Sequence, residues 1–362
     1  MPMVLPGDPA PLFLQKANTD WGRYSFDMAA GRYSLLVFMP SIQSSPDTFR
    51  TDSFRKLVER SKTGSLEIFC VTNDCPETGS LLTVPVISNS TILFDDDQTV
   101  HQLYSVAREQ RLWVLIDPML RIKLVLPDSP DVPKHLDQWL NQAPHLQNGP
   151  IPALMLDDVL EPQFCQALIS YYHSQPQNFS PVLTQNSEGA TIQTVSQSFK
   201  RRHDCTLRDE ALVRGLQARI IRRVVPEIRK SFQCTVTGMD RMIVGCYDAA
   251  ELGGFGPHRD NTVKGAFHRL FAISLNLNND FDGGDLVFPE FSDQGFRPPA
   301  GGALIFSSAL LHAVRPVTQG RRHPCPPFAF HEASLPYART QEDMAECKPS
   351  SEGYGYHRKG LV

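Results

Sequence analysis

The chain lacks several features that mark particular classes of protein. Its 362 residues include 35 Lys and Arg against 39 Asp and Glu, so it has no basic excess of the kind that binds nucleic acid. It contains no run of about 18 apolar residues, which a membrane-spanning helix would need. The first residues lack the basic and apolar segments of a secretory signal. We therefore expect a cytoplasmic protein that binds neither nucleic acid nor a membrane, in an oligomeric state that stays open.

The eight cysteines are scattered and form no CxxC pair. The closest two, Cys70 and Cys75, are separated by four residues, whereas thioredoxin-like redox chemistry favours two. A chain of this length does not depend on a disulfide framework. We expect reduced thiols, with a weak redox option at Cys70 and Cys75.

Neither an internal repeat nor a low-complexity tract occurs in the sequence. The length predicts two domains as a first expectation. The net charge of −4 comes from the first part, since residues 1–142 hold 13 basic and 17 acidic residues and residues 143–362 hold 22 of each. The chain therefore divides into an acidic N-terminal part and a neutral C-terminal part.

Short apolar runs alternate with a helical pattern in the N-terminal part. Strand-like runs cover 34–40, 66–72, 84–88 and 112–117. Apolar residues recur at helical spacing over 47–61, and 131–142 has the pattern of a closing helix. Alternation of this kind predicts an α/β domain with a central sheet over residues 1–142.

The C-terminal part follows a stretch rich in proline, residues 143–152, which we interpret as a linker. Helical patterns cover 160–174 and 208–232. Strand-like pieces separated by Gly, Pro, Asp and Asn then recur at 242–247, 270–277, 284–289, 302–308, 312–317 and 327–333. Short strands at this spacing predict a sandwich or barrel over 153–335, followed by a polar tail over 336–362.

Two basic runs occur before these strands. The run at 218–225 is interpreted as a solvated helix face, and Lys200–Arg202 as a loop. Either could bind an anionic substrate, although solvated surface is the simpler interpretation.

The tripeptide His258-Arg259-Asp260 has the clearest chemistry. In a strand, residues i and i+2 point to the same face, so His258 and Asp260 can aim at one point. His312 lies 52 residues after Asp260 and begins a strand-like run. Two histidines and one carboxylate on one side of a metal form the facial triad of non-haem Fe(II) oxygenases. The same ligand types hold zinc in hydrolases, so the triad alone leaves zinc open.

Three further features argue against a chance HxD tripeptide. A glycine-rich approach, AAELGGFGP, precedes it, as a site that needs close ligand access would require. His312 lies in an apolar context, where an imidazole needs a polar partner. Arg322 follows ten residues after His312, and a turn at Gln319-Gly320 would return it to the metal. There its guanidinium could bind a carboxylate through two hydrogen bonds.

Other residues near these motifs have simpler interpretations. Gly283-Gly284 is expected to form a tight turn or a bulge at a barrel corner. His268, His323 and His331 lack a paired ligand motif, and we expect them at the surface or beside the site instead of on the metal.

Residues 150–335 resemble the prolyl 4-hydroxylase type of Fe(II)/2-oxoglutarate dioxygenase. The resemblance rests on HRDN, HRLFAISLNLNNDFDGGDLVFPEF and PPAGGALIFSSALLHAVRPVTQGRR, and ALMLDDVLEPQFCQALI is similar to the usual entry into the first helix. It implies a double-stranded β-helix (jelly roll) with supporting helices. It implies iron on His258, Asp260 and His312. It also implies that Arg322 binds the distal carboxylate of 2-oxoglutarate, with Arg321 as the neighbouring candidate.

The same resemblance implies cofactors and a reaction. Tyr247 matches a position that often hydrogen-bonds the co-substrate, although a core tyrosine is an equal alternative. The cofactors are Fe(II), 2-oxoglutarate and O2, with ascorbate as a further candidate. The reaction hydroxylates or desaturates an unactivated C–H bond of an amino acid, a peptidyl residue or a small metabolite, and releases succinate and CO2. The identity of the substrate stays open.

Residues 4–125 resemble the peroxiredoxin and thioredoxin-like fold through GDPAPLF, LLVFMPS, ILFDDDQTVHQLYSV and LWVLIDPMLRIKLV. After Pro40 the family has a threonine four residues on and the attacking cysteine seven residues on. Here Ser44 and Asp47 occupy these places, and a carboxylate cannot act as a thiolate nucleophile. We therefore expect a docking or scaffolding domain without peroxidase chemistry. A thiol peroxidase and a non-enzymatic interaction protein are the alternatives for the whole chain.

Overall fold

A computed structural model of the chain describes residues 4–20, 22–42, 47–75, 90–143, 150–185 and 190–337. The predicted strand at 84–88, most of the predicted linker and nearly all of the tail lie outside these residues. The chain divides into two compact units, one made of residues up to 149 together with 289–293 and one made of the remainder. Both units combine helices and sheets, so the predicted mixed α/β character is confirmed, while the domain boundaries stay a prediction.

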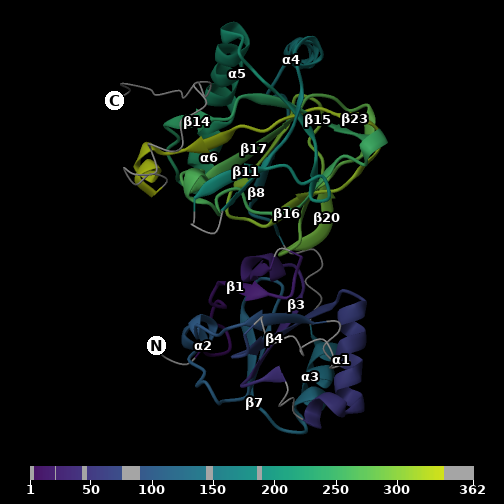
Figure 1. The fold of residues 1–362 in the computed structure, drawn as a ribbon. Coiled ribbons are helices and arrows are strands. Elements are labelled where there is room, and N and C mark those ends of the chain that lie inside the picture. The colour runs from purple at the N-terminus through teal and green to yellow at the C-terminus, as the bar shows by residue number, and fades with distance from the viewer. Residues whose placement is uncertain are drawn as a thin grey trace. The chain divides into compact units, whose positions relative to one another are not determined.

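The N-terminal unit is built on a seven-stranded mixed sheet in the order β2-β1-β5-β4-β3-β6-β7 (Figure 1). Its strands are β1 (Leu14–Ala17), β2 (Arg23–Ser25), β3 (Tyr33–Met39), β4 (Leu66–Thr72), β5 (Thr91–Phe94), β6 (Leu112–Ile116) and β7 (Ile122–Pro127). Its helices are α1 (Asp52–Lys62), α2 (Thr99–Tyr104) and α3 (Val132–Gln142), with the 3-10 helices η1 (Phe26–Ala29) and η3 (Asp47–Arg50).

The centre of this sheet consists of the apolar runs seen in the sequence. β3, β4 and β5 are parallel, β6 runs antiparallel to β3, and β7 runs antiparallel to β6. Strands buried on both faces need continuous apolar sequence, which β3 and β4 provide. α1 and α3 lie side by side on the sheet (Figure 1), and Arg60 of α1 pairs with Asp137 of α3 at 3.1 Å. α1 begins where the Thr51 side chain caps the N–H of Phe54.

The C-terminal unit contains three larger sheets and one hairpin. Its strands before α6 are β8 (Ala153–Leu156), β9 (Asn178–Phe179), β10 (Val182–Gln185), β11 (Thr191–Thr194), β12 (Lys200–Arg201) and β13 (His203–Thr206). The strands after α6 are β14 (Gly238–Asp240), β15 (Ile243–Asp248), β16 (Gly254–His258), β17 (Phe271–Asn276), β18 (Phe281–Gly283), β19 (Leu286–Phe288), β20 (Ser292–Phe296), β21 (Ala303–Ser307), β22 (His312–Val314), β23 (Val317–Arg322), β24 (Pro324–Cys325) and β25 (Phe328–Phe330). The helices are α4 (Pro162–Ser174), α5 (Glu210–Arg223) and α6 (Val225–Phe232), and the 3-10 helices are η6 (Ala249–Glu251), η7 (Lys264–Ala266) and η8 (Glu332–Tyr337).

The helix predicted over 208–232 is two helices. Pro226 lies in the first turn of α6, where its missing N–H costs nothing, but the same residue would disrupt the interior of one continuous helix. Leu216 and Ile220 of α5 and Ile228 of α6 are fully buried in the same core cluster as Ile273 and Ile305 of the sheet. These helices therefore cover one face of the sheet that contains β17 and β21.

Two sheets place the candidate residues. One has the order β12-β16-β22-β19-β20 and the other β18-β23-β15-β13-β9. The strand predicted over 312–317 is interrupted at Arg315-Pro316, so that β22 pairs in the first sheet and β23 in the second. Proline lacks the N–H that a continuous strand would require. This corner carries the chain from one sheet to the other.

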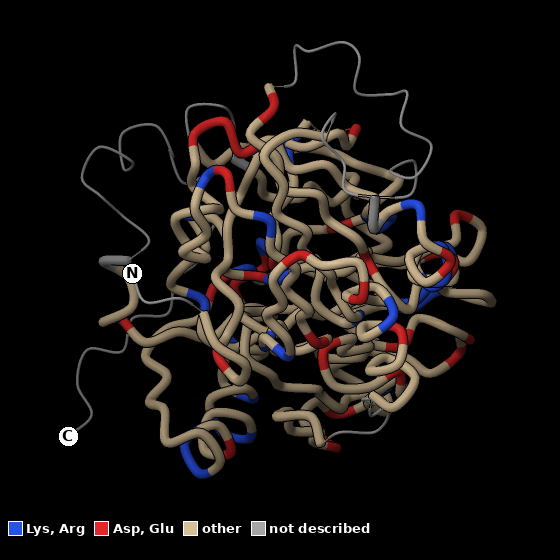
Figure 2. Tube along the Cα trace, turned by 90° about the horizontal axis from the view of Figure 1, so that it is seen from below, with Lys and Arg blue, Asp and Glu red and all other residues tan. Residues whose placement is uncertain are grey.

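Charged residues of both signs are interspersed along the trace, without a long stretch of either sign (Figure 2). Among the described residues, no helix is long and apolar enough to cross a membrane.

Candidate metal centre

The two candidate histidines lie opposite each other on neighbouring strands. His258 ends β16 and His312 begins β22, and the antiparallel register pairs these two residues directly. Their ring centroids are 4.2 Å apart. Sheet pairing therefore brings together two side chains that are distant in sequence.

Each imidazole is oriented by the backbone carbonyl two residues earlier. Nδ1 of His258 lies 2.8 Å from the oxygen of Gly256, and Nδ1 of His312 lies 3.0 Å from the oxygen of Leu310. Because a carbonyl only accepts, both Nδ1 atoms carry the proton and both Nε2 atoms offer a lone pair. Burial and the neighbouring His312 lower the pKa of His258 to about 4, which favours the neutral ring that a metal requires.

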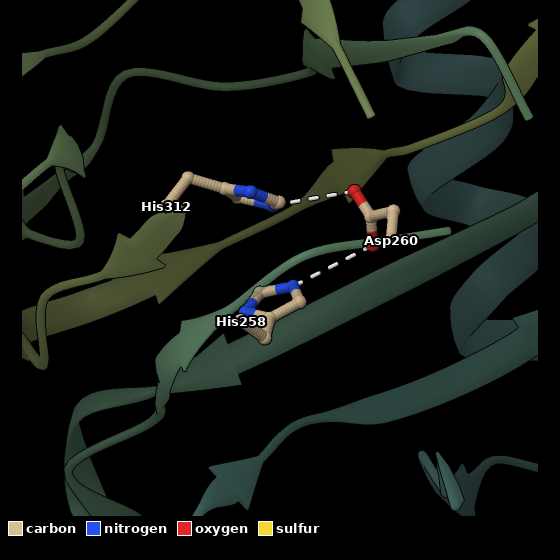
Figure 3. A group of neighbouring side chains, drawn as sticks. All are labelled: His258, Asp260 and His312. Carbon is tan, nitrogen blue, oxygen red and sulfur yellow. Dashed lines mark ion pairs between the residues drawn. The ribbon is translucent and has the colours of Figure 1, made fainter. Parts of the chain in front are cut away.

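Asp260 joins this pair from a turn. β16 ends at His258, so the predicted i, i+2 arrangement within one strand is wrong. The backbone N–H of Asp260 donates to the oxygen of Ser308 at 2.9 Å, which holds the turn against the chain just beyond β21. The two carboxylate oxygens face the two rings, with Nε2 of His258 at 3.6 Å and Nε2 of His312 at 3.3 Å (Figure 3).

This arrangement fits a bound cation. Two imidazole lone pairs and a carboxylate are all acceptors, so their close approach is unfavourable unless a positive charge lies between them. The ligand atoms of His258, Asp260 and His312 all lie within 4.8 Å of one another, the only such group of His, Cys, Asp and Glu in the part of the chain that the structure describes. The donor set suits Fe(II), and also Zn(II).

Aromatic side chains enclose the two histidines. Phe255 stacks on His258 at 3.5 Å between ring centroids, and Phe306 lies 4.7 Å from His312. A cavity of about 50 Å³ opens beside the three residues. Its lining is mostly apolar but contains three arginines, Arg202, Arg241 and Arg322. The site therefore combines a mostly apolar lining with positive charge.

Arg322 is a buried cation without a carboxylate partner among the described residues. It is 2% exposed, and its contacts are neutral oxygens of Gly284 at 2.8 Å and of Ser274 and Asn276 at 3.3 Å. Burial lowers its pKa to about 10, so it stays charged at neutral pH. An unpaired buried charge is costly, which makes this side chain suitable for binding an anionic group.

The route that brings Arg322 to the cavity differs from the prediction. Gln319 and Gly320 do not form a turn between two strands, because both lie within β23. The reversal occurs at Arg315-Pro316, between β22 and β23. Arg321 points elsewhere: its side chain is 59% exposed and pairs with Asp248 at 2.6 Å. The structure thus distinguishes the two neighbouring arginines by burial.

The glycine pair supports Arg322 directly. Gly283 and Gly284 have φ of +71° and +68°, and the register of β18 against β23 shifts at Gly283, which confirms the predicted turn or bulge. A Cβ at Gly284 would lie 3.2 Å from Cδ of Arg322 and 2.9 Å from Val317. The pair therefore provides both a carbonyl and the space for the guanidinium.

The glycines before HxD have another purpose than ligand access. A Cβ at Gly253 would lie 2.7 Å from the backbone nitrogen of Asp248, and one at Gly256 would lie 2.6 Å from the ring of Phe199. These glycines allow chain segments to pack closely, so the prediction that they open the site to a ligand is wrong.

Tyr247 faces Arg322 across the sheet. The register of β15 and β23 pairs the two residues, and the guanidinium carbon lies 5.8 Å from the ring centroid. Tyr247 is 2% exposed and lines the cavity, and its hydroxyl accepts from Nη1 of Arg202 at 3.4 Å. The residue is therefore both a core tyrosine and a cavity wall.

The interpretation of Lys200–Arg202 as a loop is wrong. Lys200 and Arg201 form β12, and Lys200 and Arg202 are 3% and 4% exposed. A signal was present, since alternate residues 200, 202 and 204 share one face of an extended chain. Arg241, which also lines the cavity, carried no such signal. The run at 218–225 covers the end of α5 and the first residue of α6, and Arg219 and Arg223 of α5 pair with Glu161 at 2.5 Å.

The remaining histidines lie apart from the group of three. His268 pairs with Asp240 at 3.1 Å, and its ring lies 5.1 Å from Phe330. His323 is 4% exposed and its Nδ1 lies 3.2 Å from the oxygen of Gly245. Nδ1 of His331 accepts a hydrogen bond from the backbone N–H of Ala333 at 3.0 Å.

In the N-terminal unit, Asp47 begins η3, while its side chain and Ser44 lie outside the described part. Burial raises the pKa of the Cys70 thiol to about 11, which disfavours the reactive thiolate. Cys75 is exposed, and no described cysteine forms a disulfide.

No family model matches the chain. It is similar to a PKHD-type hydroxylase of Synechococcus sp. (strain JA-2-3B'a(2-13)), with 26% identity over 148 residues, which cover 33% of this chain and 65% of the relative. A PKHD-type hydroxylase of Polaromonas sp. (strain JS666 / ATCC BAA-500) is 27% identical over 185 residues, covering 48% of this chain and 75% of that protein. The chain thus spans about 65% of the length of the first of these relatives.

Solved structures add two similarities. One is a prolyl hydroxylase in complex with a hypoxia inducible factor oxygen degradation domain peptide fragment from Trichoplax adhaerens, with 16% identity, a TM-score of 0.42, and coverage of 52% of this chain and 88% of that chain. The other is the mitochondrial 2-Cys peroxiredoxin from Plasmodium falciparum, with 15% identity, a TM-score of 0.32, and coverage of 38% and 91%. The resemblance to hydroxylases of the prolyl 4-hydroxylase type is therefore confirmed by the curated relatives.

Proposed function

We propose that the protein is an Fe(II)- and 2-oxoglutarate-dependent dioxygenase that hydroxylates or desaturates a C–H bond of an amino acid, a peptidyl residue or a small metabolite. In this proposal the C-terminal part is a double-stranded β-helix and the N-terminal part a thioredoxin-like domain. The boundaries follow the sequence: 1–142 and 153–335 for the domains, with 143–152 as the linker. The curated relatives that the chain resembles are hydroxylases, which supports the reaction class.

One observation carries the proposal. Two Nδ1-anchored imidazoles and a carboxylate converge on the same cavity that Arg322 lines as a buried cation without a carboxylate partner among the described residues. A zinc hydrolase needs only the three metal ligands, without a buried arginine. A keto acid that binds both a metal and an arginine needs both, so the combination favours 2-oxoglutarate.

In this proposal each residue has a distinct role. His258, Asp260 and His312 hold Fe(II), which when bound activates O2 with 2-oxoglutarate as the reductant. Three protein ligands on one side leave the other positions for co-substrate and oxygen. Burial and the neighbouring His312 lower the pKa of His258, and the backbone carbonyls of Gly256 and Leu310 fix which nitrogen of each ring is offered.

Arg322 binds the distal carboxylate of 2-oxoglutarate in this scheme. Its contacts with neutral oxygens hold the guanidinium in place without neutralising it. Ser274 and Tyr247 line the same part of the cavity and can donate further hydrogen bonds. Phe306 beside His312 keeps water from the ligands, which strengthens these charge interactions. Ascorbate would serve as an external reductant, and no residue is assigned to it.

The N-terminal unit takes no part in this chemistry. Asp47 stands where a peroxiredoxin has its attacking cysteine, and the Cys70 thiol is buried. We propose a docking or scaffolding role for it. The substrate partner of the whole protein is a small molecule or a peptide.

The test is substrate-independent turnover of 2-oxoglutarate. The purified protein is loaded anaerobically with Fe(II), mixed with 2-oxoglutarate, exposed to O2 and assayed for succinate. We expect succinate that requires Fe(II) and is lost in Asp260→Ala. If neither 2-oxoglutarate binding nor succinate is detected with Fe(II), while Zn(II) supports hydrolysis, the proposal is wrong. A product from a positive substrate screen should carry 18O from 18O2 if the enzyme hydroxylates.

A further inference from the structure

Besides Arg322, four cations border the cavity and its metal ligands. Lys200, Arg202, Arg241 and Arg269, called the cationic wall below, interact electrostatically with one another or with Asp260. Among the described residues, two further carboxylates form ion pairs with them, Asp204 and Asp240. The wall therefore holds more positive than negative charge, in a place that is mostly removed from solvent.

Two members of the wall are already neutralised. Arg202 donates two hydrogen bonds to the Asp204 carboxylate, at 2.6 and 2.9 Å, and a third to the Ser180 hydroxyl at 3.1 Å. Arg269 lies 3.5 Å from Asp240 and covers the ring of Phe328 at 4.1 Å. These two pairs use both carboxylates and leave Lys200 and Arg241 in excess.

Arg241 is the member best placed for a ligand. Its remaining ion-pair contact is a long one, 3.4 Å to the Asp204 oxygen that Arg202 already holds. It lies between β14 and β15 with φ of +61°, a conformation that costs a non-glycine residue on the order of 1 kcal/mol and that often marks functional sites. Its side chain lines the cavity and is 24% exposed, so a ligand can reach it.

Lys200 adds positive potential from behind the cavity wall. Its ammonium donates only to the oxygen of Pro181, at 3.1 Å, and lies 4.6 Å above the ring of Phe255. Phe255 in turn stacks on His258 and lines the cavity. The lysine has no carboxylate partner among the described residues, and burial together with Arg202 and Arg241 lowers its pKa well below the usual range. An anion in the cavity would relieve this repulsion.

The proposed cofactors would leave this excess in place. Fe(II) with Asp260, and 2-oxoglutarate with Arg322, balance one another in charge. Neither therefore compensates Lys200 and Arg241. A buried charge without a partner is unfavourable by several kcal/mol in general, so a third component should supply the negative charge.

We propose that the substrate carries a carboxylate and that Arg241 binds it, with Lys200 reinforcing the attraction. This inference rests on the proposed function and deepens it by naming the class of substrate. A guanidinium matches a planar carboxylate through two parallel hydrogen bonds. Arg241 is close enough to Asp260 for their charges to interact, so a carboxylate held there would keep the rest of the substrate beside the metal ligands. Arg241 acts as a specificity-determining residue.

The test uses the whole chain with Mn(II) and N-oxalylglycine, an unreactive analogue of 2-oxoglutarate that occupies Arg322. Acetate is the probe, acetamide is its uncharged counterpart, and chloride keeps the ionic strength constant. The melting temperature is recorded against probe concentration. We expect a saturable rise with acetate and none with acetamide.

Arg241→Met should raise the half-saturating acetate concentration roughly tenfold, which corresponds to about 1.4 kcal/mol. Arg214→Met is the matched control, because Arg214 is 70% exposed and pairs with Glu210 on the surface of α5. It should behave like the wild type. If Arg241→Met does not fold, Arg241→Lys keeps the charge but loses the two-point contact, and should weaken acetate binding by a smaller factor.

Three results would overturn the inference: no acetate response in the wild type, an equal response to acetamide, or an unchanged response in the Arg241 variants. A response to inorganic phosphate without one to acetate would also overturn it, since the proposal commits to a carboxylate. Failure of the proposed function has a different signature, which is the absence of any stabilisation by N-oxalylglycine with Mn(II). In that case the acetate titration is repeated in Arg322→Met without the analogue.

Discussion

Each unit of this protein buries a histidine against an aspartate, and the two arrangements differ in one respect. In the N-terminal unit, Asp95 is fully buried and accepts hydrogen bonds from Gln15, from the backbone of Val100 and His101, and from Nδ1 of His101 at 2.6 Å. In the C-terminal unit, the Asp260 carboxylate faces two Nε2 atoms at 3.3 and 3.6 Å.

The difference lies in where the ring protons are. His101 directs its Nδ1 proton at its aspartate, so the Asp95 carboxylate is satisfied within the unit and organises the start of α2. His258 and His312 give their Nδ1 protons to backbone carbonyls, so lone pairs face the carboxylate instead. The His101–Asp95 pair therefore suits a structural role, whereas the arrangement of His258, His312 and Asp260 suits a bound cation.

The largest expected effect separates these two carboxylates. Asp260→Ala should reduce Fe(II)-dependent succinate formation to background and leave the fold intact, since among the described residues the carboxylate forms ion pairs only with His258 and His312. His258→Ala and His312→Ala should do the same. Activity with Fe(II) and circular dichroism of each variant provide the check. Wild-type succinate formation in any one of them would remove that residue from the ligand set.

Asp95→Ala is the matched change in the other unit. It strands a buried imidazole and two backbone N–H groups, so the free energy of unfolding should fall by roughly 3–5 kcal/mol. Succinate formation by the folded fraction should stay near the wild-type rate. Denaturant titration measures the first effect. Loss of turnover in protein that is still folded would mean that the two units are functionally coupled.

A second comparison concerns the adjacent arginines at the end of β23. Arg322→Ala should raise the KM for 2-oxoglutarate by a factor corresponding to about 2–5 kcal/mol, because the buried carboxylate loses its charge partner. Arg321→Ala removes only an exposed pair with Asp248, worth at most about 1 kcal/mol, and should leave the KM unchanged. The reverse outcome would shift the co-substrate site by one residue.

The fourth prediction concerns the acid stability of the C-terminal unit. Burial lowers the pKa of His323 to about 4 from an ordinary value of 6.5, so the unfolded chain takes up this proton first as the pH falls. The free energy of unfolding should therefore decrease between about pH 6.5 and pH 4, by up to roughly 3 kcal/mol. His323→Gln should flatten that part of the profile. Parallel profiles for the two proteins would contradict the assignment.

The last prediction is that the N-terminal unit shows no peroxidase activity. Because Asp47 replaces the attacking cysteine, Asp260→Ala protein supplied with a thiol should consume peroxide no faster than the same chain with all cysteines replaced by serine. The Asp260→Ala background avoids peroxide chemistry of bound iron. Consumption above the cysteine-free control, abolished by Cys75→Ser, would restore a redox role to the N-terminal unit.

Local patterns predicted much of the molecule. The central strands β3, β4 and β6 follow from uninterrupted apolar runs, and α3 and α4 from apolar spacing with a proline in the first turn. The prediction of one continuous helix over 208–232 was wrong at Pro226, although the proline was a visible signal in the local sequence. Short strands such as β9, β12 and β14 escaped prediction because two or three residues carry too little periodicity.

The candidate ligands could be predicted because the residue types themselves indicate metal and anion binding. A histidine, an aspartate two residues later and a distant histidine and arginine suffice to suggest a metal and an anion. The geometry assumed for them was wrong twice, at the turn that carries Asp260 and at the corner before β23. The structure still brings His258, Asp260 and His312 together. The choice of candidate ligands depends on side-chain chemistry, whereas the path of the chain depends on which strands pair.

The sequence by itself thus determined the composition of the site, the two-part organisation and the absence of a cysteine at position 47. Only the tertiary structure decided that His258 faces His312, that Arg322 is buried while Arg321 is exposed, and that Arg241 and Arg322 line the same cavity. The physical reason is that burial and charge pairing depend on contacts between segments far apart in the chain, which no local pattern encodes.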